Sequence, residues 1–446
     1  MTVDKTPLVA NFAPRSTVGW RGGERVDIER FIGTARSLAL RLPPGGFCFN
    51  LCDDRLNFAL GLAAALLRNV VSLLPPARAP GVLRDLAAHY SPACAFADRS
   101  NPLASGPIDL REWPAPTTGD GIPAIDPSQP AVTLFTSGST GTPSPHSKRW
   151  GALVAGAVAL RARLPLAEGS VILGTVPPQH MWGFEATVML PLHSGCAIDS
   201  RTPLLPADVV ALLAGRTPPR WLVCVPLHLQ ACVAANLRMP ALAGALSATS
   251  RLEPSLARAF EVLTDAPVFE IYGSTETGAV ATRRPAEGDA FELLQGLRLD
   301  AGALPHRIAA GHVGAAVTLQ DDLEPLSATR FLLGDRAGDL VKIGGKRASL
   351  TTLNHELTCV PGVVDGVFWL PERARAPHRL SAFVVAPGVA RATILAALRE
   401  RIDPAFLPRP LVLVDALPRD ALGKIPRARL SALLARTTGN DLTRAT

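Results

Sequence analysis

Lysine, tyrosine and long apolar stretches are scarce in this 446-residue chain. No apolar run reaches the ~18 residues that a membrane-spanning helix needs, so we expect no membrane partner. The start, MTVDKTPLVANFAPRS, lacks a charged stretch followed by an apolar core, so we expect no secretory signal. The seven cysteines lack metal-ligand spacing, and nothing near Cys48 and Cys52 completes a zinc site. These features predict a protein of the reducing cytoplasm.

The net charge of +7 is spread along the chain. There is no basic run and no interleaving of basic with aromatic residues, which argues against nucleic acid as a partner. A modest positive excess favours anionic partners such as nucleotides, coenzyme A or an acidic carrier protein.

The few lysines are unevenly placed. Only five of the 45 basic residues are lysine, and four of them, Lys148, Lys342, Lys346 and Lys424, fall in three short stretches described below. Arginine can replace lysine on a solvated surface, but not where a compact point charge is needed. The placement therefore marks candidate functional positions, and chance is the alternative.

The apolar pattern alternates between helical and strand-like segments. Helices are predicted at 57–69, 152–164 and 391–401, and strands at 70–74, 132–135, 171–176, 222–225, 268–271, 366–370, 380–385 and 411–414. Such alternation is typical of α/β layers with largely parallel sheets. The pattern restarts with a hairpin-like stretch near Gly338. We therefore predict a large N-terminal α/β domain over 1–337 and a small α/β domain over 338–446.

Two loops at strand ends carry hydroxyls and glycines. The first, Leu134–Pro143, is suited to wrapping phosphates, because glycines let backbone N–H groups approach and hydroxyls donate to anionic oxygens. It is not a Walker loop, since no Gly-Lys-Ser/Thr follows. In the second, Glu270–Gly278, the carboxylate of Glu276 can hold Mg²⁺ against ATP phosphates. The alternatives are an ordinary Ser/Thr-rich turn and a surface turn.

Two further motifs lie downstream, Gly334–Arg347 and Leu417–Arg427, and each alone could be a charged turn. Together and in this order, the four motifs resemble the adenylate-forming superfamily of acyl- and aryl-CoA synthetases, luciferases and peptide-synthetase adenylation domains. The resemblance spans about Val132 to Leu430. It implies ATP and Mg²⁺, a carboxylic acid, an acyl adenylate and a thiol acceptor. It also implies that the C-terminal domain is a mobile lid, with the active site between the domains.

The resemblance assigns roles to residues of the first two motifs. It makes Glu276 the Mg²⁺ ligand, Tyr272 the residue that stacks near adenine, and Thr140 a catalytic hydroxyl. The phosphate loop comprises Thr136, Ser137, Gly138, Ser139, Thr140, Gly141 and Thr142, and the second ATP-binding segment comprises Tyr272, Gly273, Ser274 and Thr275.

The remaining assignments fall closer to the C-terminus. Arg336 would contact ribose or phosphates, and Asp321 would bind ribose, with Asp322 a close second. Lys424 would bridge the acid's carboxylate and the α-phosphate, where an ammonium neutralises two groups that repel each other. Gly338 would be the hinge, since glycine lowers the strain of rotation.

The chain departs from the family pattern at three places, one of which is Gly338, at a hinge position that is usually Asp or Lys. The family usually has lysine directly after the phosphate-loop proline, but here Ser144 stands there and Lys148 comes four residues later. Ser247–Arg251 replaces the usual glycine-rich adenine shelf. These departures put details of nucleotide contact in doubt, rather than the reaction class.

The segment Pro177–Phe184 matches the part of the family that lines the acid pocket. We predict that His180, Met181, Trp182, Gly183 and Phe184 line it, although His180 could be a core histidine and one or two of the others could be core. Glu185 is the only acid nearby, and no aspartate is placed to hold an amino group. An amino-acid substrate is therefore not expected.

The chain length, the segment Thr142–Lys148 and the segment Gly344–Ser349 most resemble compact ligases of bacterial aryl-polyene or xanthomonadin-type pigment pathways. That resemblance implies a hydroxybenzoate-like acid loaded onto the phosphopantetheine thiol of an acyl carrier protein, with coenzyme A as the other acceptor. An aliphatic acyl-CoA synthetase and a catalytically inactive nucleotide- or acyl-binding homologue are the alternatives.

Overall fold

The computed structural model describes residues 5–99, 107–119, 121–136, 144–300, 302, 304–336, 340–343, 346–370, 379–420, 423–426 and 429–434, with backbone alone at 335–336, 340, 342 and 346–347. The chain divides into two compact units. The first comprises 1–318 with 326–331, and the second comprises 319–325 with 332–446. The predicted boundary at 337/338 stays a prediction, because residues 337–339 lie outside the described ones.

A six-stranded sheet forms one layer of the first unit within the described residues. Its order is β10 (Ser144–Arg149), β9 (Pro130–Thr136), β5 (Val71–Leu74), β4 (Phe47–Asn50), β6 (Cys94–Ala97) and β7 (Pro107–Asp109). The strands from β9 to β7 are parallel, and β10 runs antiparallel to β9. The sheet therefore ends at β10, a strand with polar residues on both faces.

A second, larger sheet carries the other half of the first unit. Its order is β17 (Ala290–Leu293), β16 (Gly278–Arg283), β15 (Val268–Ser274), β14 (Gly244–Ser247), β13 (Arg220–Cys224), β11 (Val171–Gly174), β12 (Ala197–Asp199), β2 (Thr17–Arg21) and β3 (Glu24–Asp27). The strands from β15 to β2 are parallel. Strands β21 (Asp321–Pro325) and β22 (Arg330–Arg336) follow later in the chain.

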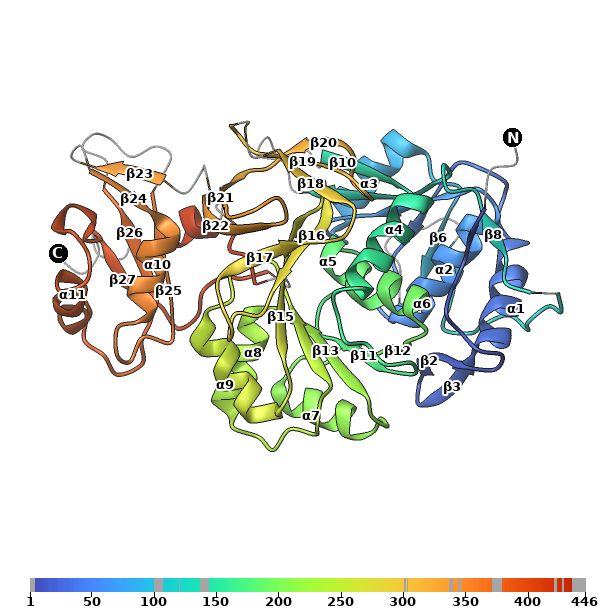
Figure 1. The fold of residues 1–446 in the computed structure, drawn as a ribbon, viewed down its shortest axis with the longest axis horizontal. Coiled ribbons are helices and arrows are strands. Elements are labelled where there is room, and N and C mark those ends of the chain that lie inside the picture. Colours follow the sequence, from blue (N-terminus) through green and yellow to red (C-terminus); the bar gives the residue numbers. More distant parts are fainter. Residues whose placement is uncertain are drawn as a thin grey trace. The chain divides into compact units, whose positions relative to one another are not determined.

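Helices cover both sheets (Figure 1). In the first unit they are α1 (Ile28–Ala39), α2 (Arg55–Leu67), α3 (Pro80–Tyr90), α4 (Trp150–Arg161), α5 (Met181–Phe184), α6 (Leu190–Ser194), α7 (Pro206–Ala214), α8 (Pro226–Ala235) and α9 (Pro254–Thr264). A π-helix, Glu185–Met189, joins α5 to α6. Helix α2 packs against strands of both sheets, which explains why it is apolar on every side.

Helices α7, α8 and α9 lie together against β13 and β15 (Figure 1). Buried side chains of these helices, such as Leu213, Leu229 and Phe260, share one apolar cluster with Leu222 and Val268 of the strands. This layer is what a parallel sheet requires, because both of its faces must be covered.

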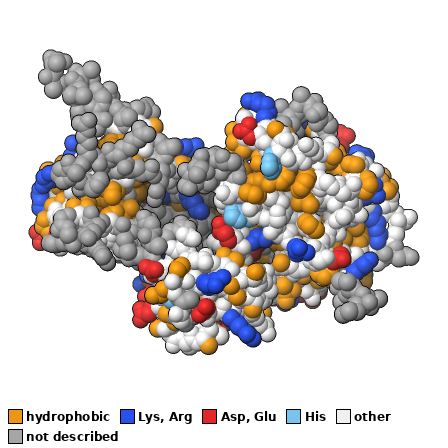
Figure 2. Space-filling model, turned by 90° about the horizontal axis from the view of Figure 1, so that it is seen from above, with side chains coloured by type: hydrophobic (Ala, Val, Ile, Leu, Met, Phe, Trp, Pro, Cys, Tyr) orange, Lys and Arg blue, Asp and Glu red, His pale blue; other side chains and the backbone are white. Residues whose placement is uncertain are grey.

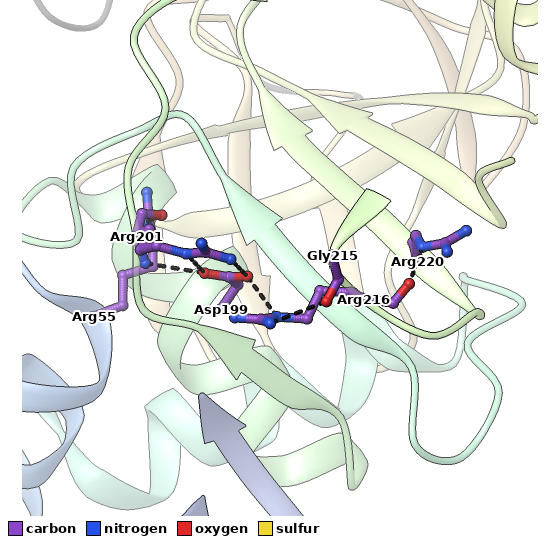
Figure 3. A network of polar contacts seen from close by, with 6 residues as sticks. All are labelled: Arg55, Asp199, Arg201, Gly215, Arg216 and Arg220. Carbon is purple, nitrogen blue, oxygen red and sulfur yellow. Dashed lines mark hydrogen bonds and ion pairs between the residues drawn. The ribbon is translucent and has the colours of Figure 1, made fainter. Parts of the chain in front are cut away.

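A charge network links Arg55 of α2 with Arg201, Asp199 and Arg216 (Figure 3). Arg55, fully buried, donates to the carbonyls of Gly174 at 2.6 Å and Val176 at 2.7 Å, and also to the carbonyl of Arg201. Asp199 accepts from Arg201 and, at 2.8 Å, from Arg216. Burial lowers the pKa of Arg55 to about 10. The network fixes the backbone that leads into the segment Pro177–Phe184.

Two smaller parts complete the fold. Strands β18 (Leu297–Asp300), β19 (Arg307–Ala310) and β20 (Gly314–Thr318) form an antiparallel sheet of the first unit, and β1 (Thr6–Pro7) pairs with β8 (Ala124–Ile125). The second unit contains the hairpin β23 (Leu340–Ile343) and β24 (Lys346–Ser349), the sheet β25 (Asp365–Trp369), β26 (Ser381–Val385) and β27 (Leu411–Leu413), helices α10 (Leu350–Thr358) and α11 (Arg391–Arg399), and a 3₁₀ turn at Pro404–Phe406.

The predicted α/β class with layered, mostly parallel sheets is confirmed. The helix predicted at 152–164 is α4, and the strands predicted at 222–225 and 268–271 are β13 and β15, shifted by a few residues. Among the described residues, no helix has both the length and the apolar content to cross a membrane. On the face shown in Figure 2, acidic and basic side chains are interspersed rather than gathered by sign.

Candidate active site

The first motif leaves β9 and returns on β10. β9 ends at Thr136, and β10 begins at Ser144, which is paired with Thr136 across the ladder. Six of the predicted phosphate-loop residues, Ser137, Gly138, Ser139, Thr140, Gly141 and Thr142, lie outside the described residues. The pairing shows that both ends of this loop meet at one edge of the first sheet.

The second motif forms the connection between β15 and β16. Ser274 pairs with Gly278, and the Ser274 N–H donates to Thr277 Oγ1 at 3.1 Å. Gly278 has φ +74°, a conformation that L side chains rarely adopt. The loop is thus a tight turn that leaves the side chain of Glu276 half exposed near its tip.

Side chains of β10 join the two motifs. His146 Nε2 lies 3.0 Å from Thr136 Oγ1 and 3.6 Å from Glu276 Oε1. Lys148 Nζ donates to the backbone carbonyl of Glu276, across 128 residues of sequence. The end of the phosphate loop and the predicted metal ligand are therefore neighbours in the fold.

The carboxylate of Glu276 is set up to stay ionised. Partial burial works against the charged form, but hydrogen bonds from its own backbone N–H and from Ser274, with the charges of His146 and Lys148, outweigh it and lower its pKa. Mg²⁺ prefers oxygen ligands and is commonly held by one or two carboxylates together with substrate phosphates. An ionised, accessible carboxylate beside a phosphate loop fits that cation. Among the described residues, no group of three or more His, Cys, Asp or Glu side chains is clustered for a metal.

Tyr272 is held by aromatic neighbours just before the turn. Its ring makes edge contacts with Phe291 at 5.9 Å and Phe331 at 5.8 Å between centroids, and it is half-buried. Phe291 and Phe331 stack on each other at 5.7 Å. This packing fixes the orientation of the ring that we predict to lie near adenine.

The predicted acid-pocket segment is a short buried helix. His180 caps α5 and is half-buried, whereas Met181, Trp182, Gly183 and Phe184 are buried. A Cβ on Gly183 would lie 2.0 Å from the carbonyl oxygen of Pro177, so only glycine fits there. Three aromatic or apolar side chains thus lie on one helical turn.

The three large side chains of α5 have different neighbours. Phe184 is fully buried and packs edge-on against Phe58 of α2, which makes it part of the core. Trp182 Nε1 donates to the Cys224 carbonyl at 2.9 Å, and the methyl of Met181 faces the backbone of Gly278. Met181 is therefore the member of the segment that reaches the second motif.

Glu185 follows α5, and its carboxylate lies against Gly278, the last residue of the second motif. Its carboxylate accepts from the Ala279 N–H at 3.0 Å, and burial raises its pKa to about 7, although Lys148 and this hydrogen bond oppose the shift. His312, from the β19–β20 connection, donates from Nε2 to the Ala279 carbonyl at 2.8 Å. The peptide groups of Ala279 are thus held on both sides. The sequence analysis noted Glu185 only as a nearby acid and did not single out His146 or His312.

The remaining predicted residues belong to other parts of the chain. Asp321, half-buried, and Asp322, exposed, begin β21. Arg336 ends β22 with its side chain outside the described atoms, and Gly338 lies outside the described residues.

Lys424 lies in a hydrogen-bonded turn of the second unit. Its N–H donates to Asp420 Oδ1 at 2.9 Å, and its carbonyl accepts from the Asp420 N–H at 2.7 Å. Arg419 donates to the Gly423 carbonyl at 2.6 Å and is paired with Asp365. The backbone of the turn is therefore anchored, while the Lys424 side chain is exposed.

Comparison with known proteins agrees with this arrangement. Residues 65–303 match the family described as AMP-binding enzyme. This chain belongs to the AMP-binding enzyme family. It is 34% identical over 284 residues to a 4-coumarate–CoA ligase of Rhodobacter capsulatus, covering 62% of this chain and 69% of that protein. It is 26% identical to a sulfoacetate–CoA ligase of Cupriavidus necator, over 90% and 88% of the two chains.

The fold is shared with solved members of the adenylate-forming superfamily. The o-succinylbenzoate CoA synthetase of Bacillus subtilis, solved with its acyl-adenylate intermediate, superposes with a TM-score of 0.79 at 18% identity, covering 94% of this chain and 95% of that one. With its family membership and its CoA-ligase relatives, the chain is an AMP-forming acid–thiol ligase.

Proposed function

We propose that this ligase activates an aryl carboxylic acid of the hydroxybenzoate type and transfers it to a phosphopantetheine thiol, carried by an acyl carrier protein or by coenzyme A. The observation that carries the proposal is the meeting of Thr136, His146, Lys148 and Glu276 where the phosphate loop leaves and rejoins the first sheet. A triphosphate held there would lie between hydroxyl donors, two basic side chains and one ionised carboxylate.

The reaction then has two steps. A carboxylate oxygen of the acid attacks the α-phosphorus of ATP, and pyrophosphate leaves with the electrons of the broken P–O bond. The thiol sulfur next attacks the acyl carbon, and AMP leaves as the thioester forms. Glu276 would hold Mg²⁺, which when bound would neutralise phosphate charge and polarise the P–O bonds.

Each predicted residue has a distinct task in this scheme. Glu276 holds the cation, Thr136 and Thr140 donate to phosphate oxygens, and Tyr272 orients the base. Lys424 stabilises the charge that develops between carboxylate and α-phosphate. Asp321 and Arg336 bind the ribose and phosphates, and the second unit turns about Gly338 between the steps.

Three features support an aryl acid. Met181 lies at the junction of α5 with the second motif, and Trp182 lies beside it on the same helical turn. The nearest acid, Glu185, is already bonded to Ala279 and so is not a free partner for a substrate ammonium. The R. capsulatus relative is named for 4-coumarate, an aromatic acid. Aromatic and apolar side chains commonly line such pockets.

Pyrophosphate release with a panel of acids tests the substrate class. The panel comprises 3- and 4-hydroxybenzoate, 4-coumarate, octanoate, sulfoacetate and alanine. The hydroxybenzoates should give the highest kcat/KM and alanine none, and a second assay should compare thioester formation on CoA and on holo-acyl carrier protein. A higher kcat/KM for octanoate or sulfoacetate would overturn the aryl assignment, and no release with any acid would point to an inactive homologue.

Lys424→Ala tests the assigned chemistry. Loss of one electrostatic donor in a water-poor site removes about 2.7–4 kcal/mol of transition-state stabilisation, so adenylation should fall on the order of a hundred- to a thousandfold. Transfer of a supplied acyl adenylate to the thiol should stay close to the wild-type rate, because that step does not bring a carboxylate and a phosphate together. Adenylation within a few-fold of wild type would make Lys424 a solvated surface lysine.

A further inference from the structure

The turn that carries Glu276 has internal hydrogen bonds. Ser274 and Thr277 bond to each other's backbone and hydroxyl groups, which closes the turn on itself. The side chain of Glu276 remains 46% exposed. Within the turn its carboxylate accepts from Ser274 and from its own backbone N–H, and contacts from other elements add to these bonds.

Two side chains from distant parts of the sequence contact this turn and the strand that follows it. Lys148 of β10 donates to the Glu276 carbonyl, and Glu185 accepts from the Ala279 N–H. Between these contacts, a Cβ on Gly278 would lie 2.4 Å from Glu185 Oε1, so glycine permits the close approach of the carboxylate. One contact thus holds the tip of the turn at Glu276, and the other holds the start of β16 at Ala279.

These two side chains also attract each other. Burial lowers the pKa of Lys148 and raises the pKa of Glu185 to about 7, and the attraction between the two charges opposes both shifts. Glu185 is the first residue of the π-helix Glu185–Met189. Such helices are rare overall, and those that occur are often found at functional sites. Lys148, which lies four residues beyond the usual family position, is thus close enough to Glu185 of a separate helix to interact with its charge.

We propose that Lys148 and Glu185 are a pair of positioning residues. Lys148 holds the tip of the turn at Glu276 and Glu185 holds the start of β16 at Ala279, so that Glu276 meets the metal–ATP complex in the correct orientation. This inference rests on the proposed role of Glu276 as the Mg²⁺ ligand. Neither side chain needs to touch the reacting atoms. Their loss should weaken metal–nucleotide binding more than it slows the chemical step.

The experiment measures pyrophosphate release by the full-length chain at varied Mg²⁺ and ATP concentrations. The disruptive variants are Lys148→Met, which keeps the stem but has no donor, and Glu185→Leu, which has no acceptor. The conservative variants are Lys148→Arg and Glu185→Gln, and Gln still accepts from the Ala279 N–H. Matched controls are Lys5→Ala, an exposed lysine, and Glu292→Gln, whose partner is Arg163.

Each disruptive variant should raise the Mg²⁺ concentration for half-maximal rate about tenfold, the factor expected when one hydrogen bond to a charged group is lost. The kcat at saturating Mg²⁺ and ATP should change less than threefold, and the conservative variants should restore most of the Mg²⁺ response. The double variant Lys148→Met/Glu185→Leu should show less than the product of the single effects, because both residues hold one turn.

Three results would overturn the inference. In the first, both disruptive variants keep a wild-type Mg²⁺ response while Glu276→Gln loses it. In the second, the variants lower kcat alone, which is the mark of a merely structural role. In the third, Glu276→Gln itself keeps a wild-type Mg²⁺ response. The proposed metal role of Glu276 would then be wrong, and so would the inference that rests on it. The Glu276→Gln measurement therefore distinguishes a wrong metal role from a wrong positioning role.

Discussion

The ion pair of Glu270 and Arg283 permits a quantitative prediction for the hairpin that carries the second motif. The two residues face each other across β15 and β16, with Arg283 Nε 2.6 Å from Glu270 Oε2 and both side chains at least 96% buried. Glu270 also accepts from the Leu252 N–H at 2.9 Å, and Arg283 donates to the Leu252 carbonyl at 3.0 Å. Burial raises the pKa of Glu270 even with its partner present.

Arg283→Met should leave the Glu270 carboxylate buried and without its charge partner. Breaking a buried pair in this way costs about 3–5 kcal/mol in the free energy of unfolding. The contact of Arg283 with Asp289 adds little, because Asp289 is 59% exposed. Loss of the positive charge also removes an influence that lowers the pKa of Glu270, so this pKa should rise further.

The sign of the pH dependence follows from that rise. A carboxyl whose folded pKa lies above its unfolded value binds more protons in the folded state, so stability is highest at acid pH and falls as pH rises between the two values. The destabilisation by Arg283→Met should therefore be smaller at pH 5 than at pH 8. At lower pH more of the buried carboxyl is protonated, and the neutral form carries less of the penalty.

Urea unfolding followed by tryptophan fluorescence, at pH 5 to 8, measures this difference for wild type, Arg283→Met and the double variant Glu270→Gln/Arg283→Met. The double variant should lose most of the excess pH dependence, because no unpaired buried carboxyl remains. A cost below 1 kcal/mol at pH 8, or an equal cost at pH 5 and pH 8, would refute the reasoning.

Two further predictions concern the phosphate loop and the core. Thr140→Ala should lower kcat/KM for ATP about ten- to a hundredfold, since a charge-assisted hydrogen bond is worth about 1.5–3 kcal/mol; an unchanged value would remove the loop from the site. His193 is fully buried beside Trp150, neither ring nitrogen has a hydrogen-bond partner among the described residues, and burial lowers its pKa from 6.5 to about 4. Its stabilising contribution is therefore complete above pH 6.5 and lost, by up to about 3 kcal/mol, as pH falls towards 4. His193→Leu should flatten that part of the acid-unfolding profile, and superimposable profiles would contradict this.

Elements with strong apolar periodicity were predictable from the sequence. The helix expected at 391–401 is α11, Arg391–Arg399, and the strand expected at 380–385 is β26, Ser381–Val385. The stretch Leu340–Ser349 was expected to be hairpin-like, and it forms the paired strands β23 and β24. In each case the local pattern and the packing favour the same structure.

Strand β10 could not be predicted in this way. Its sequence, Ser-Pro-His-Ser-Lys-Arg, is polar throughout and lacks the branched and aromatic residues typical of strands. Strand β10 forms because the chain comes back alongside β9 after residue 143, and the edge of β9 offers backbone groups that β10 can pair with. An edge strand needs no apolar face of its own when a long-range partner supplies the hydrogen bonds.

The position of Glu276 in a loop at a strand end was predictable from the sequence, and its contacts with distant residues were not. The sequence placed Glu276 in a loop at a strand end, and the structure describes such a loop. The contact of Lys148 with Glu276 spans 128 residues, and that of Glu185 with Ala279 spans 94. No local pattern encodes contacts at such separations. Two sequence signals did point towards Lys148: the scarcity of lysine, and the lysine that the family usually has at the position of Ser144, four residues earlier.

That scarcity has a physical explanation at position 148. Five of the 45 basic residues are lysine, and here the cation is partly buried among a backbone carbonyl and two carboxylates, Glu185 and Glu276. An ammonium is a compact charge with three donors on a flexible stem, so one donor can bond the Glu276 carbonyl while the charge attracts both acids. A guanidinium would bring five donors in a rigid plane, and those left unpaired in a partly buried place would be costly. Lys148→Arg in the Mg²⁺ experiment should therefore restore the charge but not the full metal response, which distinguishes a geometric requirement at this position from a purely electrostatic one.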